Sequence, residues 1–356
     1  MASLGSAVLL AAELARVSGL SPRSWLTRRV GRERVFLDVG DERLRLDVYR
    51  AEGVRPRAAV VASLGMFLRG IDDQRFREVC QAMARAGFVV LAPQHADFAS
   101  FRFSVDPVPR IVAAFEHAAA LPGIQEGRRV GLLGFCVGGG ASLCAAADRR
   151  IRGRVRFVAT FGAAYDLRNF GRYALTGESD HGREVIRGKP QKLWGMVILA
   201  NMAPRIGLAG DEERIRRYVA ELLEGDERAI ARAWDALSPA AQEVLGIVGT
   251  GGRAAVHDLV ERHIGAVPSE WLSPRDVVHL IRCPVFLFHG RQDPLVPYTE
   301  AIKLHEALAL RVPTRLLVSD LAGHTEVGPL QSPWTRLKEA ARFLAWVREL
   351  LAAGLG

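Results

Sequence analysis

Residues 131–140 read GLLGFCVGGG, and this glycine spacing is typical of a strand that turns sharply into a helix. Gly134 and Gly138 stand two positions before and two positions after Cys136. An abrupt turn of this kind brings both flanks of its central residue close to neighbouring chain, so larger side chains there would clash. The turn therefore predicts that Cys136 projects clear of a sheet, at the N-terminus of the next helix.

Cys136 occupies the position where such a turn more often carries serine. The positive end of the helix dipole would favour its thiolate, which is the reactive form of cysteine. Three interpretations are open from the turn alone: a nucleophile, a small buried residue in a glycine-rich turn, or a cysteine that replaces serine and blunts turnover. The first predicts an acid and a base later in the chain.

Two suitable residues follow later predicted strands. Asp293 lies just beyond the apolar run in CPVFLFHGRQDPLVP (283–297), and His324 lies beyond the next run in TRLLVSDLAGHTEVG (314–328). Each is common alone, Asp293 as a turn carboxylate and His324 as a loop histidine. Because the carboxyl ends of parallel strands face one crevice, their order after Cys136 predicts a triad of nucleophile, acid and base.

The backbone supplies the expected oxyanion hole. One donor is predicted to be the N–H of Val137, directly after the nucleophile, and the other the N–H of Met66, with Phe67 as the less favoured alternative. No metal-ligand spacing and no phosphate-binding glycine loop is present, so no cofactor or metal is predicted. Other histidines lack the triad's positions and are interpreted as structural or surface residues; they include His95, His117, His181 and His289.

Hydrophobic periodicity predicts an α/β fold with a mostly parallel central sheet and helices on both faces. Residues 34–53 alternate apolar and polar positions on either side of Gly40 and Asp41, which indicates a β-hairpin. Continuous apolar runs then alternate with helical patterns, which is the sequence form of a covered parallel sheet. The predicted helices span 73–86, 108–121, 137–147, 298–310 and 333–352.

The alternation stops between residues 165 and 275, where the pattern is mostly helical without a convincing buried strand. We therefore predict a helical cap inserted into the core. The predicted divisions are an N-terminal amphipathic helical segment at 1–28, core at 29–166, cap at 167–275 and core again at 276–356. Apolar residues of the cap either line an acyl pocket or pack the cap onto the core: Trp194, Met196, Val197, Ile198 and Leu199.

Net charge, cysteine spacing and the N-terminal apolar run indicate which partners and which location to expect. The 356 residues carry a net charge of +9, but the arginines are scattered and accompany no recognition motif, so no nucleic-acid partner is expected. The four cysteines lack the density and spacing of a secreted disulfide scaffold, which favours a cytoplasmic location. Glu13 and Arg16 interrupt the apolar N-terminal run, so residues 1–28 are expected to lie on the protein or on a membrane surface rather than to span a bilayer.

The motifs GFCVGG, HGRQDPLVP and AGH together resemble those of the α/β-hydrolase superfamily, and within it the bacterial dienelactone hydrolase-like proteins. The resemblance covers about residues 34–352 without the insertion. It implies the α/β-hydrolase fold, with Cys136 as nucleophile, Asp293 as acid, His324 as base and Met66 in the oxyanion loop. Two features depart from the family: the long insertion, and Gly65 where the family's loop carries a glutamate.

The chain is also similar to the smaller polyhydroxyalkanoate synthases, which combine such an elbow with a helical cap. Two activities are therefore predicted: hydrolysis of a carboxylic ester, lactone or thioester, which the motifs favour, and acyl transfer of the synthase type. In both, the partner is a small acyl substrate. A scaffold that keeps the fold without catalysis is the third alternative, and the sequence predicts no oligomeric state.

Overall fold

The computed structural model describes residues 28–124, 129–182, 184–267, 272–320 and 332–356. Its main sheet has eight strands in the order β1-β2-β4-β3-β5-β6-β9-β10. Strands β1 and β2 are antiparallel, β2 is antiparallel to β4, and all other neighbours are parallel. The strands are β1 (Val30–Val39), β2 (Glu42–Ala51), β3 (Ala58–Ser63), β4 (Phe88–Pro93), β5 (Val130–Phe135), β6 (Val155–Phe161), β9 (Val285–Gly290) and β10 (Thr314–Ser319).

The helices of the core follow the predicted alternation with these strands. The five helices predicted there are confirmed, with ends that differ by at most three residues. The short α3 was not predicted. The core helices are α2 (Gln74–Arg85), α3 (Ala96–Ala99), α4 (Pro107–Ala119), α5 (Val137–Ala147), α12 (Thr299–Ala309) and α13 (Pro333–Leu355).

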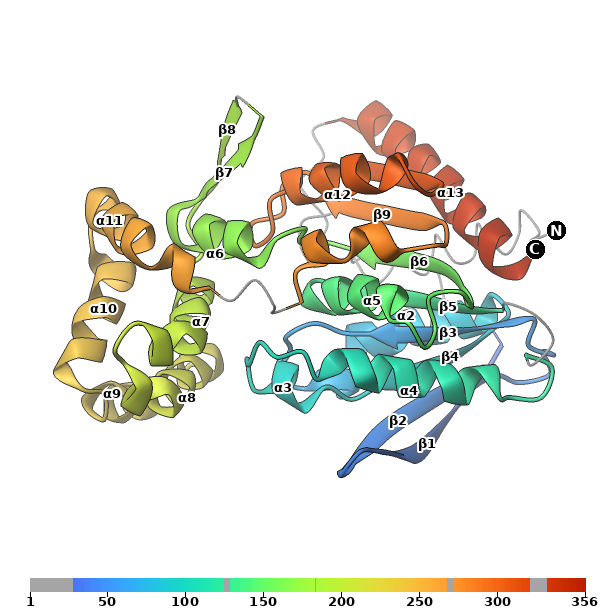
Figure 1. The fold of residues 1–356 in the computed structure, drawn as a ribbon, viewed down its shortest axis with the longest axis horizontal. Helices are drawn as coiled ribbons and strands as arrows, with labels where there is room; N and C mark the ends of the chain where they lie inside the picture. The colour runs from blue at the N-terminus through green and yellow to red at the C-terminus, as the bar shows by residue number, and fades with distance from the viewer. Residues whose placement is uncertain (1–27, 125–128, 183, 268–271, 321–331) are drawn as a thin grey trace.

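Both faces of the sheet are covered, as buried parallel strands require. Strand β3 shows the alternation: Ala59 and Val61 belong to the hydrophobic cluster under α4 and α5, whereas Val60 and Ala62 belong to the cluster under α2 and α13. This places α5, which follows Cys136, against β5 and β6. Figure 1 shows the helices stacked on the two sides of the sheet.

The predicted hairpin is confirmed at the edge of the sheet. Val39 pairs with Glu42, and Gly40 between them has a φ of +60°, a conformation that favours glycine. On β2, Asp47 is fully buried and is ion-paired with Arg32, Arg34 and Arg45. Three guanidinium groups thus compensate the buried carboxylate in this hairpin.

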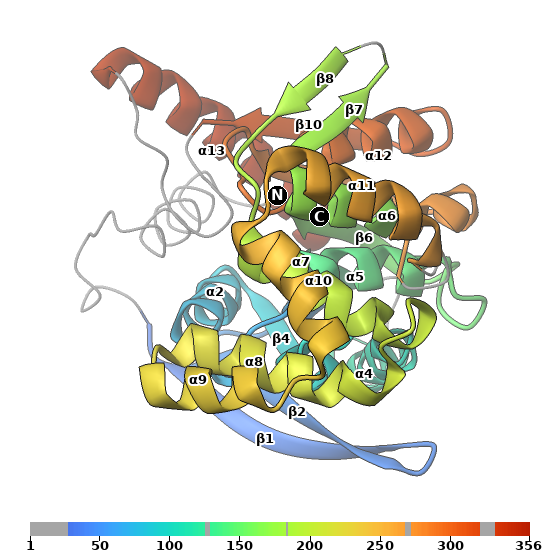
Figure 2. The same cartoon turned by 90° about the vertical axis from the view of Figure 1, so that its left-hand side faces the viewer.

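The segment between β6 and β9 is helical, as predicted, and gathers at one end of the sheet (Figures 1 and 2). A two-stranded antiparallel hairpin, β7 with β8, also lies in it and was not predicted, because its four-residue strands are too short to show a pattern. The elements are α6 (Leu167–Thr176), β7 (Glu178–His181), β8 (Glu184–Arg187), α7 (Lys192–Met202), α8 (Glu212–Glu224), α9 (Glu227–Asp235), α10 (Pro239–Thr250) and α11 (Arg253–His263).

Specific polar contacts attach this helical segment to the core. Fully buried Glu300, on α12, accepts hydrogen bonds from the backbone N–H groups of Tyr165 and Asp166, just before α6. Asn201, on α7, receives a bond from the N–H of Phe103 and donates to the carbonyl of Phe101. The segment is therefore joined to the core at its own start and along α7.

The apolar stretch of α7 packs against the core. Met196, Val197, Ile198 and Leu199 are buried in the same cluster as α4 and α5, and Trp194 packs edge-on against Phe101. Of the two interpretations of this stretch, the described structure favours packing. Among the helices that the structure describes, none combines the length and apolar character that a membrane crossing requires.

Candidate active site at the turn between β5 and α5

Cys136 forms the predicted sharp turn between β5 and α5. Its φ of 54° and ψ of −128° lie in a region that non-glycine residues rarely occupy. The N–H of Cys136 donates to the carbonyl of Phe161 at 2.8 Å, which ties the turn to the neighbouring strand β6. Strain of this kind persists only where the surroundings hold it.

The glycines around Cys136 have the steric cause that the sequence predicts. A Cβ on Gly134 would lie 2.4 Å from the carbonyl oxygen of Gly138, and a Cβ on Gly138 would lie 2.5 Å from the carbonyl oxygen of Ser63. Both distances are too short for any side chain, because the obstacles are backbone atoms. Strand β5, helix α5 and the end of β3 therefore meet at Cys136 with no space between them.

The loop after β3 lies directly against this turn. A Cβ on Gly65 would come within 3.0 Å of the Cys136 Cβ and within 3.3 Å of the Val137 nitrogen. Met66, the next residue, is buried in the core cluster. The structure thus brings together the loop and the helix start from which the two oxyanion donors are predicted. Met66 and Val137 as donors remain a prediction, because no bound oxyanion is present.

Two residues that follow β4 contact the two ends of this loop, and neither was predicted as a site residue. The side-chain Oε1 of Gln94 accepts a hydrogen bond from the N–H of Ile71 at 3.1 Å, at the far end of the loop. The Nε2 of His95 lies 3.3 Å from the hydroxyl of Ser63, at the near end. The signal available was their position directly after a strand of the parallel sheet, which is where site residues gather.

His95 is neutral in this position. Its side chain is buried and packs edge-on against Phe98, and burial lowers its pKa from 6.5 to about 3, with a further contribution from the charge of Arg110. Nδ1 of His95 is buried without a hydrogen-bond partner among the described residues. His95 is thus a structural residue, one of the two alternatives that the sequence predicted, and it contacts the strand end that leads into the loop after β3.

Asp293 is buried in the loop after β9, as predicted. Its Oδ1 accepts hydrogen bonds from the N–H groups of Leu295 and Val296, at 2.8 and 3.0 Å, which fixes the carboxylate in the turn. Its Oδ2 lies 3.4 Å from the Nε2 of fully buried His289. Because the same Nε2 is 2.9 Å from the carbonyl of Val296, which only accepts, Nε2 carries the hydrogen. His289 therefore supports the Asp293 loop from within β9.

Tyr173 of α6 brings the helical segment close to Asp293. Burial raises the pKa of Tyr173, and the negative charge of Asp293 raises it further. The phenol is also close to the chain after β8, since a Cβ on Gly188 would lie 2.2 Å from its oxygen. Tyr173 is thus one residue of the helical segment that lies near the candidate acid.

His324, the predicted base, lies outside the described residues, as does the N-terminal segment 1–27. The structure therefore describes two members of the predicted triad, Cys136 and Asp293, on the loops that follow β5 and β9. Within the described ranges, no group of three or more His, Cys, Asp or Glu side chains has the arrangement of a metal site.

Burial raises the pKa of the thiol in each of the other three cysteines. Cys144, two turns further along α5, has its pKa raised to about 12 by burial, and burial raises that of Cys283 to about 12 as well. Burial also raises the pKa of Cys80. These three thiols stay protonated at neutral pH and are unreactive as nucleophiles.

Comparisons with known proteins establish the fold. No family model matches the chain, and no curated protein matches its sequence. Among solved structures, acylaminoacyl peptidase from Pyrococcus horikoshii is similar over 92% of this chain with a TM-score of 0.52 and 14% identity. The chain spans only 44% of the length of that peptidase.

Two shorter proteins are also similar. A dienelactone hydrolase from Anabaena variabilis aligns with 90% of this chain and 98% of its own, at 15% identity and a TM-score of 0.45. Est1E from Butyrivibrio proteoclasticus aligns over 90% and 99%, at 12% identity and a TM-score of 0.47. With the sheet order and the likeness to the peptidase, the fold is that of the α/β-hydrolases.

Proposed function

We propose that this protein is a hydrolase of carboxylic esters, lactones or thioesters, with Cys136 as its nucleophile. The observation that carries the proposal is the backbone of Cys136, strained at a φ of 54° and held against the loop after β3. A merely structural small residue has no need of such a conformation, and strained residues of this kind concentrate at functional sites. The structurally similar hydrolases, peptidase and esterase support the same reaction class.

The proposed reaction has two steps. His324 takes the proton of the Cys136 thiol, the thiolate attacks the carbonyl carbon, and the resulting oxyanion accepts hydrogen bonds from the N–H groups of Val137 and Met66. The C–O or C–S bond to the leaving group then breaks, and the leaving group takes the proton from His324. Water, deprotonated by His324, hydrolyses the thioester and frees Cys136. Asp293 keeps the imidazole in its productive tautomer.

The helical segment 167–275 is proposed as the roof of this site. Tyr173 lies close enough to Asp293 for that charge to raise its pKa, and Phe103 packs against Phe170 of α6. Helical segments over such crevices commonly select substrates by size. We therefore expect a substrate whose acyl group is enclosed by residues of the core and of this segment.

The test is hydrolysis of a panel of p-nitrophenyl esters with acyl chains of increasing length. Wild type is compared with Cys136→Ala and Cys136→Ser, and intact mass detects any acyl adduct. We expect Cys136→Ala to lower kcat/KM at least about 1000-fold, as removal of a nucleophile does. Cys144→Ala is the matched control, because it removes a half-buried cysteine from α5, the helix that follows Cys136, and should leave turnover unchanged.

Each outcome is informative. Turnover in wild type that Cys136→Ala abolishes supports the proposal, and an acyl adduct on Cys136 identifies the intermediate. Activity only in Cys136→Ser shows a site tuned for serine and contradicts the cysteine as the working nucleophile. Wild-type turnover that survives in Cys136→Ala, or silence from all variants with the fold intact, contradicts the proposal altogether.

A further inference from the structure

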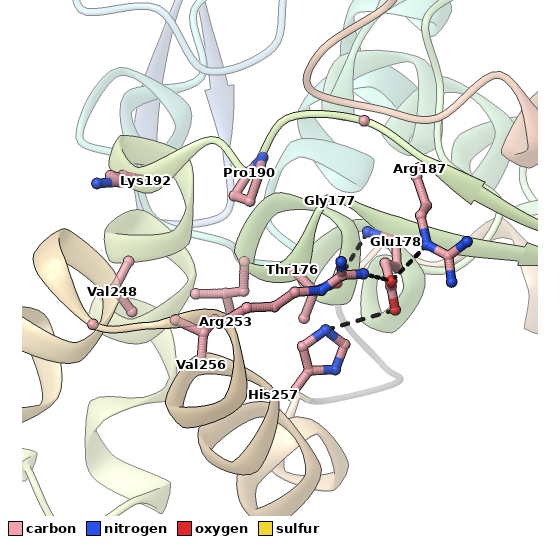
Figure 3. Close-up of a pocket in the computed structure, with 13 residues that line it drawn as sticks. Thr176, Gly177, Glu178, Arg187, Pro190, Lys192, Val248, Arg253, Val256 and His257 are labelled. Atoms are coloured by element: carbon pink, nitrogen blue, oxygen red, sulfur yellow. Dashed lines mark hydrogen bonds and ion pairs between the residues drawn. The ribbon is translucent and has the colours of Figure 1, made fainter.

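A pocket lies within the helical segment, and none of its lining residues belongs to the turn at Cys136. Its volume is about 250 Å³, and it is enclosed by the ends of α6 and α10, the starts of α7 and α11, and the two strands of the β7–β8 hairpin (Figure 3). The reaction proposed above gives this pocket no role. The residues that line it are Leu175, Thr176, Gly177, Glu178, Arg187, Gly188, Pro190, Lys192, Val248, Gly251, Arg253, Val256 and His257.

The lining has an excess of positive charge. Arg187, Lys192 and Arg253 are permanent cations at neutral pH, and Glu178 is the one carboxylate among the lining residues. Three cations against one anion leave a surplus of two positive charges before His257 is counted. The hydrogen bond from Arg187, together with the charges of Arg253 and His257, lowers the pKa of Glu178 and keeps it ionised.

Glu178 uses only part of the hydrogen-bonding capacity of these cations. Its Oε1 accepts from the Nε of Arg187 at 3.1 Å and from an Nη of Arg253. A guanidinium has five N–H donors in a fixed fork, so both arginines have further donors for an incoming group. Lys192 donates one of its three N–H bonds to the carbonyl of Gly249.

His257 is partly exposed but adds one buried ring nitrogen. Its Nε2 has no hydrogen-bond partner among the described residues, and the Oε2 of Glu178 is 3.6 Å away. That separation is too long for a hydrogen bond. Figure 3 shows Arg187, Arg253 and His257 converging on Glu178 from three sides.

The backbone at the pocket also favours an anion. Helix α7 begins at Lys192 and helix α11 begins at Arg253, and neither has a side-chain cap at its N-terminus. Uncapped N–H groups at a helix start, with the positive end of the dipole, attract negatively charged groups. Here two such starts border one pocket whose side chains are already cationic.

The remaining wall is apolar, with Leu175, Pro190, Val248 and Val256 beside the cations. We propose that this pocket binds a small organic oxyanion, a carboxylate or phosphate on a short apolar chain, through Arg187 and Arg253. The charged group lies at the arginines and the chain along the apolar wall. This binding does not depend on the chemistry at Cys136.

Binding is measured by titration calorimetry at constant ionic strength, without turnover. The probes are hexanoate, hexyl phosphate and inorganic phosphate, with hexanol as the uncharged control. We expect saturable binding of the two alkyl anions, weaker binding of inorganic phosphate and none of hexanol. The tighter of hexanoate and hexyl phosphate identifies which head group the pocket prefers.

Three variants test the assignment. Arg253→Gln should weaken binding of the alkyl anions at least about tenfold, because a charge-assisted hydrogen bond is lost. Arg262→Gln is the matched control: Arg262 is on the same helix, pairs with Asp258 and does not line the pocket. Glu178→Gln should tighten binding severalfold, because it removes the opposing carboxylate.

The last variant keeps the test decisive if Arg253→Gln folds poorly, since a damaged fold does not gain affinity. Equal binding of hexanol and hexanoate would overturn the proposal, as would an absence of anion binding up to millimolar concentration. Equal losses in Arg253→Gln and Arg262→Gln would also overturn it, because only a general charge effect would remain.

Discussion

Buried His95 predicts a pH dependence of stability that one substitution should remove. The pKa of His95 is about 3 in the folded protein against 6.5 for an exposed histidine. Below pH 6.5 the unfolded chain therefore binds a proton that the folded protein does not, and stability falls as the pH falls. At pH 5 the gap to 6.5 is about 1.5 pH units, and at 1.36 kcal/mol per unit the loss is about 2 kcal/mol.

The perturbation is His95→Gln, which keeps an amide near Ser63 and cannot titrate. Urea unfolding of wild type and variant at pH 7.5 and pH 5 gives the free energy of unfolding at each pH. Wild type should lose about 2 kcal/mol more than the variant between the two values. Because both proteins carry the same carboxylates, the difference isolates His95.

The control is His279→Gln, since His279 is exposed and has no such environment. Its pH dependence should match that of wild type. If His95→Gln and wild type lose the same free energy between pH 7.5 and pH 5, His95 is protonated in the folded protein. The conclusion that His95 is neutral and buried beside the loop after β3 would then be wrong.

Three further predictions concern packing and charge. Gly138→Ala should lower stability by about 1–3 kcal/mol and abolish hydrolysis, because its Cβ meets backbone of Ser63 at 2.5 Å; Gly246→Ala, with open space around it, is the control in urea unfolding and ester assays. Gln94→Ala removes the acceptor of the Ile71 N–H, so it should speed hydrogen exchange at Ile71 and lower kcat about tenfold with KM little changed. An unaltered exchange rate would show that Gln94 does not stabilise the loop. Asp47→Asn should destabilise the edge hairpin by about 1–3 kcal/mol, measured by thermal unfolding, because three arginines lose a buried charged partner; a change under 0.5 kcal/mol would refute this.

Local features around Cys136 were determined by the sequence itself. The turn from β5 into α5 follows from the spacing of Gly134 and Gly138, because only glycine fits where backbone approaches within 2.5 Å. The same holds for the Gly40 turn and for the bounds of α5, which match the predicted 137–147. Periodicity also predicted the alternating strands and helices, since a strand that is buried on both faces is a continuous apolar run in the sequence.

The partners of these local features were decided only by the tertiary structure. Gln94 and His95 reach the loop after β3 because β4 is the neighbour of β3 in the sheet, and periodicity does not encode strand order. His289 supports Asp293 through a contact inside one short segment, but its direction depends on which face of β9 it occupies.

The pocket in the helical segment could be predicted from the sequence even less than these contacts. Glu178, Arg187 and Arg253 stand on three different elements, and in the sequence they are separate surface charges. Only the packing of α11 against α6 and the hairpin turns them into a cationic site. Steric limits between sequence neighbours can be predicted from those residues alone. The convergence of charged side chains depends on packing between distant segments, which the sequence pattern does not specify.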